Sequence, residues 1–228
     1  IREEAPDAYV SLSSEVAPII GEYERTATAA MNSYLAPKVV SYLDDIKGHL
    51  RARGFAGAFS ILNSAGGVMP VAEAARRPVT LVSSGPSGGV MGSLHLARQM
   101  GIRNVITTDM GGTSFDVAII VDEKPLLSTN HEAGGFHIST PMIDIRAIGA
   151  GGGSIARVHD GLLQVGPESA GARPGPACYG RGGTLPTVTD ADVVLGIIDP
   201  ATFLGGRMKL DRDSAARAID AHVAKPLG

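Results

Sequence analysis

The feature that most limits how this chain can fold is a glycine loop joining two strands. Residues 105–108 read Val-Ile-Thr-Thr, and residues 115–121 alternate with period two, as a strand does. Between them stands Asp-Met-Gly-Gly-Thr-Ser-Phe-Asp, residues 109–116. A Walker loop needs a lysine and opens a helix, and a dinucleotide fingerprint also continues into a helix. The strand–loop–strand order therefore excludes both of these nucleotide-binding classes.

A glycine hairpin between two aspartates fits a third class, the hairpins that cradle phosphate in actin-like and sugar-kinase ATPases. Glycine lets backbone N–H groups approach phosphate oxygens without obstruction, and neighbouring hydroxyls add hydrogen bonds. Asp109 can hold Mg²⁺ through water, and Asp116 can orient a water or support the loop. We therefore predict Asp109 and Asp116 as catalytic residues, Asp109 as the metal ligand, and as phosphate-binding residues Gly111, Gly112, Thr113 and Ser114. The alternative is a tight hairpin that uses glycine only for positive φ angles.

Two more glycine-rich segments are candidate binding loops. Residues 84–89 (Ser-Gly-Pro-Ser-Gly-Gly) follow a predicted strand at 79–82 and open a predicted helix. Ser87 and Gly88 can bind an anion at this helix start, or the glycines can serve close helix–sheet packing. Folding the glycine-rich segment 149–154 into one conformation costs much backbone entropy. We therefore expect that a ligand or a crossing segment of the chain requires glycine there. From this cluster we predict as cofactor-binding Gly151, Gly152, Gly153 and Ser154.

The first 55 residues are predicted to be mainly helical. Residues 8–14 suggest a short strand, and a helix is expected from about Glu15, interrupted by Pro37 and followed by a second helix that ends at Gly54. Apolar residues recur at helical spacing in both parts, so we expect both faces to pack on the core. The first face contains Val16, Ile19, Tyr23, Ala27, Ala30 and Tyr34, and the second contains Val39, Leu43, Ile46 and Leu50.

From residue 56 onward, short apolar runs alternate with glycine clusters, which is typical of α/β architecture. Residues 166–190, rich in glycine and proline, suggest a long ordered loop. Asp190 is expected to cap a helix reaching about Ile198, and Asp211 or Asp213 to open a last helix. We therefore predict a helical segment at 1–55, folded as a helical hairpin, that packs on an α/β lobe at 56–228.

Composition narrows the function classes. The net charge is −3 without a basic stripe, which argues against nucleic acid as the partner. A single cysteine excludes an internal disulfide framework and fits a reducing compartment. No apolar run is long enough to span a membrane, and no signal segment opens the sequence. We therefore expect a cytoplasmic protein.

Five further residues leave alternatives open. His131 and His137 flank a glycine pair and can be weak metal-ligand candidates. Cys178 can be a nucleophile, although a buried structural thiol is favoured. Asp144 and Arg146 lie two residues apart on a predicted strand, so they share a face as an ion pair or a ligand clamp.

Five long motifs in order resemble the hydantoinase A / 5-oxoprolinase family, which includes acetone carboxylase subunits. They are SSGPSGGVMG, TTDMGGTSFDVAII, IGAGGGSIARV, VGPESAGARPGPACYGRGG and PTVTDADVVLG, and the helical start LSSEVAPIIGEYERTATAAMNSYLAP also fits. The resemblance implies an actin-like, ribonuclease H-like ATPase fold, with residues 109–116 as the second phosphate loop. It implies ATP and Mg²⁺ as cofactors and phosphorylation of an amide or ketone oxygen, with charge stabilisation from Arg146 or Arg173.

The resemblance further implies an ATP-dependent hydrolase that opens a cyclic amide such as a lactam or hydantoin, working with a hydantoinase B-type subunit or domain, and a homo-oligomer. A ketone carboxylase subunit and a sugar-kinase-like phosphotransferase are alternatives. The family's first phosphate loop and its adenosine-contacting segment are not in this sequence. We therefore expect an internal segment that holds a partial fold, and a non-catalytic assembly domain stays an alternative.

Overall fold

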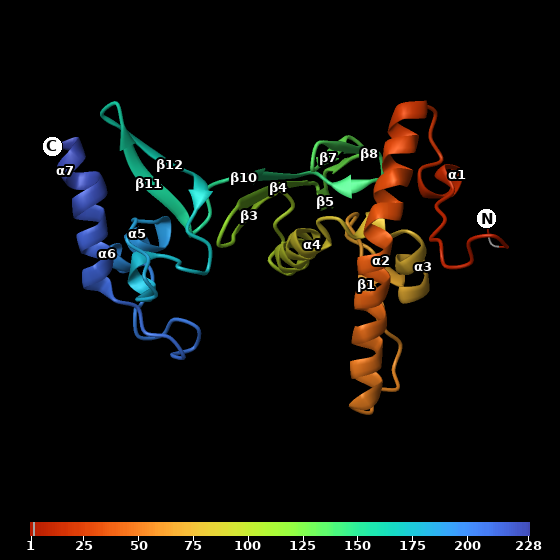
Figure 1. Cartoon of the computed structure of the whole chain (residues 1–228), viewed down its shortest axis with the longest axis horizontal. Helices are drawn as coiled ribbons and strands as arrows, with labels where there is room; N and C mark the ends of the chain where they lie inside the picture. Colours follow the sequence, from red (N-terminus) through yellow and green to blue (C-terminus); the bar gives the residue numbers. More distant parts are fainter. Residues whose placement is uncertain (2) are drawn as a thin grey trace. The chain divides into compact units, whose positions relative to one another are not determined.

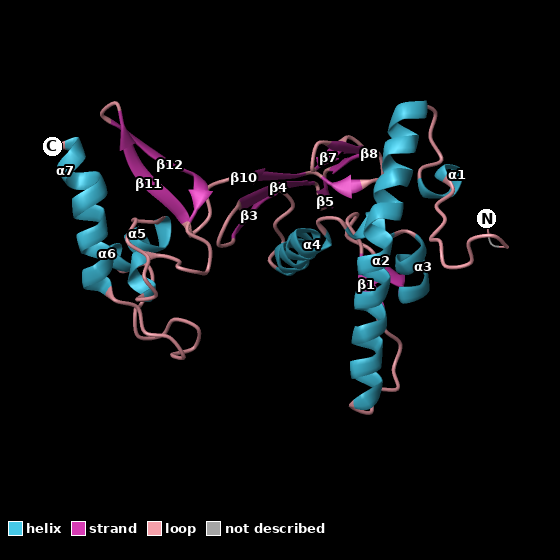
Figure 2. Cartoon of the chain, in the orientation of Figure 1, coloured by secondary structure: helices cyan, strands magenta, loops and turns pink. Residues whose placement is uncertain are grey.

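The computed structural model describes residues 1 and 3–228, which form helices and sheets in two compact units. The first unit comprises Ile1–Thr107 and Ala118–Ile145, and the second comprises Thr108–Val117 and Arg146–Gly228. Figures 1 and 2 show the elements of each unit in a mixed α/β arrangement. Residues 1–55 lie within the first unit, and a domain boundary at residue 55 stays a prediction.

The first unit is built around one long helix. Its elements are α1 (Ser13–Val16), α2 (Glu22–Ala52), β1 (Ser60–Leu62), β2 (Val68–Pro70), α3 (Val71–Arg76), the 3₁₀ turn η1 (Pro78–Leu81), α4 (Ser84–Gln99), β5 (Lys124–Pro125), β6 (Leu127–Ser128), β7 (His131–Ala133), β8 (Phe136–Ile138) and β9 (Met142–Ile143). Antiparallel pairs join β1 to β2, β6 to β9 and β7 to β8.

In each of three strands, the chain passes from one unit to the other. They are β3 (Val105–Met110), β4 (Phe115–Val121) and β10 (Ile145–Ile148), in the order β10–β4–β3, with β5 paired to β4. The two strands predicted around the glycine loop are thus confirmed. The second unit adds β11 (Ser154–His159), β12 (Leu162–Ser169), η2 (Ala177–Tyr179), α5 (Val188–Leu195), α6 (Arg212–Ile219), the π-helical η3 (Asp220–Ala224) and α7 (Lys225–Leu227).

The predicted helix break at Pro37 is wrong, because α2 is one helix of 31 residues that runs through it. Proline removes the hydrogen bond to the carbonyl four residues earlier. Pro37 is exposed, so water can reach that carbonyl, and buried residues on both sides hold the helix: Asn32, Ala36 and Leu43. The region is therefore a single long helix and not a hairpin.

The predicted burial of the first apolar face is confirmed for Val16, which lies in α1, but is wrong for Tyr23 and Tyr34 of α2. Tyr23 and Tyr34 are 67% and 78% exposed, whereas Thr28 and Asn32 are fully buried. These polar side chains accept hydrogen bonds from backbone N–H groups of other segments. The Asn32 Oδ1 accepts from the Val79 N–H at 3.1 Å, and the Thr28 Oγ1 accepts from the Ser139 N–H at 3.0 Å. Hydrogen bonding therefore decides which face of α2 turns inward. The second predicted face is borne out, with Leu43 buried and its neighbours half-buried.

Two strands predicted in the first unit are absent from the described residues. Residues 79–82 fall mostly in η1, where Pro78 sets the first φ angle and Val79 is fully buried. Residues 8–14 pair with no strand; Tyr9 instead donates its hydroxyl to the carbonyls of Ala75 and Arg76 at 2.8 Å. In both places an apolar segment is anchored without a strand partner, which periodicity does not reveal.

The core of the second unit is a small cluster around α5 and α6. Cys178, Val193, Leu210 and Ala215 are buried together, and the rings of Tyr179 and Phe203 lie 5.7 Å apart. Asp211 caps α6 as predicted. The N-cap of α5 is Thr187 and not Asp190, which instead occupies the third helical position of a capping box. The predicted loop at 166–190 is shorter than expected, since β12 extends to Ser169.

Among the helices formed by the described residues, none combines the length and the apolar character needed to cross a bilayer.

Candidate functional site

The predicted phosphate loop is the turn between β3 and β4. The Gly111 N–H donates to the Ser114 carbonyl at 2.9 Å, which closes a hairpin. The strands β3 and β4 are neighbours in the sheet, so continued antiparallel pairing from this closure is expected to set Asp109 opposite Asp116. Asp109 is exposed and Asp116 is half-buried. The structure thus places each aspartate on one of the two strands that the turn joins.

The second glycine cluster packs against this turn from the side. The Gly152 N–H donates to the Gly111 carbonyl at 2.9 Å, and the Gly153 N–H donates to the Gly112 carbonyl at 2.7 Å. The crossing chain that residues 149–154 were expected to need is therefore the phosphate loop itself. Two loops that were predicted separately, about 40 residues apart in the sequence, therefore contact each other through backbone hydrogen bonds.

Close backbone contact explains the glycines of this second loop. A Cβ added at Gly151 would lie 2.6 Å from the backbone nitrogens of Thr113 and Ser114, and one at Gly153 would lie 2.7 Å from the Gly112 carbonyl oxygen. Neither glycine has a positive φ. These positions therefore need glycine because a side chain would separate the two loops.

Gly112, in the turn itself, has the opposite character. A Cβ at Gly112 would meet no atom within 4 Å, and neither Gly111 nor Gly112 has a positive φ. In the part of the chain that the structure describes, the N–H groups of Gly112, Thr113 and Ser114 donate to no protein acceptor. Neither turn geometry nor protein packing therefore accounts for Gly112.

The start of α5 holds the second loop in place. Thr189 donates both its backbone N–H and its hydroxyl to the Gly152 carbonyl, each at 2.8 Å. Sequence analysis did not single out Thr189, although the Thr-x-x-Asp pattern at 187–190 marks a capping box that could have located this helix start.

Asp190 is the buried anchor of this helix start. Its carboxylate accepts hydrogen bonds from the backbone N–H groups of Ala177, Cys178 and Thr187 at 3.1, 2.7 and 2.8 Å, and from the Thr187 hydroxyl at 2.9 Å. The residue is fully buried. It therefore ties the 176–178 segment to the helix that supports the glycine loops.

Ser154 lies inside this arrangement. The residue is fully buried, and its hydroxyl has no partner within the described residues. Ala170 donates its N–H to the Gly153 carbonyl at 2.8 Å, and the Ser169 hydroxyl lies 3.5 Å from the Gly112 carbonyl. Ser169 at the end of β12 and Ala170 after it thus contact both loops.

Ser87 and Gly88 belong to α4 in the first unit. The buried Ser87 hydroxyl lies 3.0 Å from the Ser64 carbonyl and 2.9 Å from the Ser83 carbonyl, so it is used inside the protein. A Cβ at Gly88 would lie 2.9 Å from the Leu62 side chain. These contacts are those of close packing, and phosphate binding by Ser87 and Gly88 stays a prediction.

The other polar candidates do not converge on a metal. His131 pairs with Ile138, and His137 pairs with Glu132, so the two histidines occupy different cross-strand pairs. The described residues contain no group of three or more His, Cys, Asp or Glu that could hold an ion. Arg173 is exposed on the loop after Ala170.

Cys178 is a structural thiol in this geometry. The side chain is fully buried in the core of the second unit. Burial raises the pKa of the Cys178 thiol far above its usual range, and hydrogen bonding to the Asp190 carboxylate raises it further. The thiolate, which is the nucleophilic form, is therefore disfavoured.

Known proteins resemble this chain in both sequence and structure. The family model described as Hydantoinase/oxoprolinase matches residues 25–228. Over its whole length the chain is 42% identical to the caprolactamase subunit alpha of Pseudomonas jessenii, of which it covers 33%. It is also 42% identical to the acetophenone carboxylase gamma subunit of Aromatoleum aromaticum, and this alignment covers all of the chain and 32% of that subunit.

Two solved structures have the same fold over this region. The crystal structure of the ATP-dependent caprolactamase from Pseudomonas jessenii matches all of the chain with a TM-score of 0.83, and the match covers 33% of that chain. The nucleotide-free structure of acetone carboxylase matches 95% of the chain at 35% identity with a TM-score of 0.77, and the match covers 30% of that chain. The chain thus spans about a third of the length of these relatives.

Proposed function

Since this chain belongs to the hydantoinase/oxoprolinase family, we propose that it forms part of an ATP-dependent enzyme and that residues 109–116 bind the nucleotide phosphates. In this proposal the chain is a partial actin-like, ribonuclease H-like ATPase fold. The β3–β4 hairpin supports this assignment, because it presents a glycine turn between strands and not before a helix.

Unpaired backbone donors in the turn, together with open space at Gly112, carry the proposal. Three consecutive N–H groups, those of Gly112, Thr113 and Ser114, lack protein acceptors among the described residues, and Gly112 has free space where a Cβ would stand. Successive backbone N–H groups form an anion-binding concavity. A phosphate oxygen fits such a group of donors, and glycine allows it to approach.

Asp109 and Asp116 supply the charge that a magnesium ion needs. Two carboxylates opposite each other on a hairpin repel, and a cation between or beside them relieves that repulsion. Mg²⁺ commonly uses one or two carboxylates together with waters and substrate phosphates. We assign Asp109, the exposed carboxylate, as the ligand, and Asp116 as the residue that orients a metal-bound water or supports the turn.

We propose a cyclic amide as the substrate class. An amide is a poor electrophile, and transfer of the γ-phosphoryl group of ATP to its oxygen makes that oxygen a leaving group, after which water opens the ring. The name and the structure title of the caprolactamase support this reading, since a lactam is a cyclic amide. Several relatives are named as subunits, which supports a partner such as a hydantoinase B-type subunit or domain.

A specific observation also favours a second candidate, ATP-dependent ketone carboxylation. The acetophenone carboxylase gamma subunit is as similar to the chain as the caprolactamase subunit, at 42% identity over its full length. Both reactions begin with phosphorylation of an oxygen, so the same loop can serve either. Incubation of the assembled enzyme with a lactam, or with a ketone and bicarbonate, distinguishes them by the product formed.

Calorimetric titration of Mg·ATP and Mg·ADP into the chain tests the loop assignment. We expect saturable binding that is lost or weakened at least tenfold in Asp109→Ala, because the variant removes the proposed metal ligand. Asp45→Ala, at an exposed position on α2, is the matched control and should bind as the native chain does. Absence of binding by the native chain, or equal binding by Asp109→Ala, contradicts the assignment and favours an assembly role.

A further inference from the structure

The last turns of α2 are followed by a segment that folds back beside them. Gly54 has a φ angle of +81°, and its N–H donates to the Arg51 carbonyl at 2.9 Å. The Phe55 N–H donates to the Leu50 carbonyl at 3.0 Å. These two bonds form a Schellman motif, which brings the side chain after the glycine against the helix. Figure 1 shows the chain turning back alongside the end of α2. The helix end itself therefore places Phe55 next to Leu50.

This fold-back borders a cavity of about 270 Å³ within the first unit. Its apolar lining comes from the end of α2, the segment after it and the start of α3, through Leu50, Phe55, Phe59 and Val71. It is here called the Phe55 cavity. Its volume lies just below the roughly 300–1,000 Å³ of pockets for drug-sized molecules, so it suits a smaller ligand.

Gly57 keeps the Phe55 ring against the backbone beside the cavity. A Cβ at Gly57 would lie 2.7 Å from the ring, although Gly57 has no positive φ angle. Glycine at this position therefore serves the contact with the ring and not a turn. Phe55 is 46% exposed, and Phe59 is half-buried. The ring is thus held by the protein and keeps accessible surface for a ligand.

Two basic side chains line the same cavity. Lys47 and Arg51 are four residues apart, so they lie on one side of α2, and both are exposed. Neither forms an ion pair with any residue that the structure describes. Residues 46–72 contain no Asp or Glu, and the next acidic residue, Glu73, already pairs with Arg76 at 3.8 Å. The cavity therefore combines an apolar lining with two positive charges that the protein does not neutralise.

An anion with an apolar body matches these surroundings. Basic residues at a helix C-terminus also suit the helix dipole, but the dipole does not account for the two phenylalanines beside them. The planar fork of arginine binds a carboxylate through two parallel hydrogen bonds, and lysine adds a point charge. We propose that the Phe55 cavity binds a small organic carboxylate with an apolar body. Arg51 and Lys47 hold the carboxylate group, and Phe55 and Phe59 contact the body.

Titration of phenylacetate into the chain, followed by two-dimensional NMR of the backbone amides, tests the site. We expect a dissociation constant on the order of 1 mM, with shift changes centred on residues 47–59. Phenylacetamide lacks the charge and acetate lacks the ring, so each should bind roughly fivefold more weakly or worse. No saturation up to about 20 mM phenylacetate, or equal affinity for phenylacetamide, would overturn the proposal.

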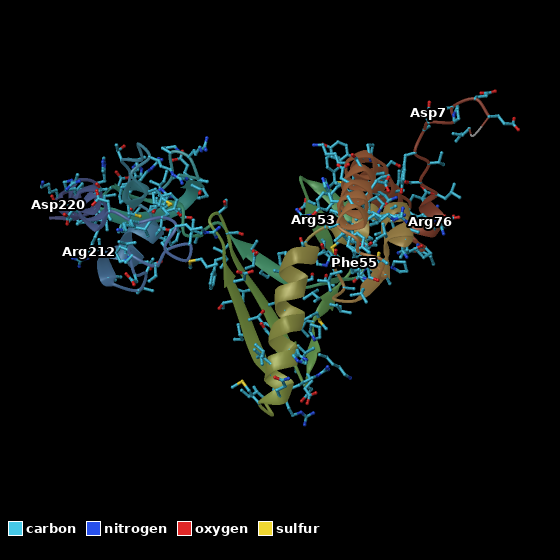
Figure 3. The ribbon with its side chains drawn as sticks, turned by 90° about the horizontal axis from the view of Figure 1, so that it is seen from below. Asp7, Arg53, Phe55, Arg76, Arg212 and Asp220 are labelled. Atoms are coloured by element: carbon cyan, nitrogen blue, oxygen red, sulfur yellow. The ribbon has the colours of Figure 1, made fainter. Side chains whose placement is uncertain are left out.

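A pair of exposed arginines localises the binding. Arg51→Gln removes one of the two charges of the cavity and should weaken phenylacetate binding roughly threefold or more. Arg53→Gln is the matched control, because Arg53 is exposed two residues further on and does not line the cavity. Figure 3 labels Arg53 and Phe55. Equal weakening by the two variants would indicate general attraction of anions to the basic helix end and would contradict the cavity.

The test is separate from that of the nucleotide loop. The Phe55 cavity belongs to the first unit, whereas the glycine turn at 111–114 belongs to the second. Arg51→Gln should therefore bind Mg·ATP as the native chain does. A variant that loses both phenylacetate and Mg·ATP binding would indicate a general loss of structure, and it would contradict a local role of Arg51 in the cavity.

Discussion

The two glycine loops of the second unit look alike in sequence and differ in what they contact. In the loop at 149–154, a Cβ at Gly151 or Gly153 would run into the backbone of the neighbouring turn. In the turn at 111–114, a Cβ at Gly112 would reach no protein atom. The first loop needs glycine for contacts within the protein, whereas the protein itself gives no reason for glycine at 112.

This difference assigns different roles to the two loops. The inner loop positions the turn through backbone hydrogen bonds, and α5 in turn holds the inner loop through Thr189. The outer turn has open space at Gly112, and the N–H groups of Gly112, Thr113 and Ser114 have no protein acceptor among the described residues. Substitutions in the inner loop and its supports should therefore lower stability, and substitutions at Gly112 should alter ligand binding alone.

The largest effect is expected at the base of the support. Asp190→Ala leaves three buried N–H groups and one hydroxyl without their acceptor, so we expect it to lower the free energy of unfolding by about 3–5 kcal/mol. Urea denaturation followed by circular dichroism measures this. A loss below about 1 kcal/mol would mean that Asp190 does not anchor the helix start.

Gly151→Ala tests the close approach of the two loops. Its Cβ would lie 2.6 Å from backbone atoms, which cannot move aside as a flexible side chain can. We expect a loss of about 2–4 kcal/mol in unfolding free energy. Gly48→Ala in α2 is the control, because that position is open, and the change should be neutral or stabilising by up to about 1 kcal/mol. Equal stability of the two variants would contradict the packed role of Gly151.

Thr189→Val removes one hydroxyl from the link between α5 and the inner loop. The Gly152 carbonyl keeps the backbone N–H of Thr189, so the expected loss in unfolding free energy is only about 1 kcal/mol. Thr189→Ser keeps the hydroxyl and should retain most of the stability. If the Ser variant is as unstable as the Val variant, the methyl group and not the hydrogen bond explains the effect.

Gly112→Ala should change stability least and binding most. The added methyl group meets open space, so the unfolding free energy should stay within about 0.5 kcal/mol of the native value. Because the methyl group would stand where a phosphate approaches, we expect Mg·ATP affinity to fall at least tenfold in calorimetry. If neither the affinity nor the stability changes, Gly112 has no role in ligand binding. The contrast between a loop that needs glycine for packing and a turn that needs it for binding would then fail.

Sequence patterns within short segments correctly predicted those strands and helices that the short segments themselves determine. The runs at 105–108 and 115–121 correctly predicted β3 and β4, and the segment at 84–89 was correctly predicted to open a helix, α4. Predictions failed where a residue's surroundings lie far away in sequence. Tyr23 and Tyr34 of α2 were expected inside, yet Thr28 and Asn32 turn inward because Ser139 and Val79 present N–H groups there. Such partners cannot be read from spacing within one helix.

The site shows the same limit. The two aspartates and both glycine loops could be identified from their motifs, and the family resemblance stated from those motifs is confirmed by the match over residues 25–228. The supporting residues Thr189 and Asp190 were missed or given another role, since their partners at Gly152, Ala177 and Cys178 come from other segments. An aspartate that caps a helix and an aspartate that binds other segments from inside the core look the same in the sequence.

The sequence by itself determined that a glycine turn joins two strands and that a second glycine cluster must meet something at close range. It determined this because backbone freedom and strand periodicity are properties of short segments. Only the tertiary structure decided that the two loops meet each other and that Gly112 is left facing open space. Those outcomes depend on which backbone groups come within hydrogen-bonding distance after folding.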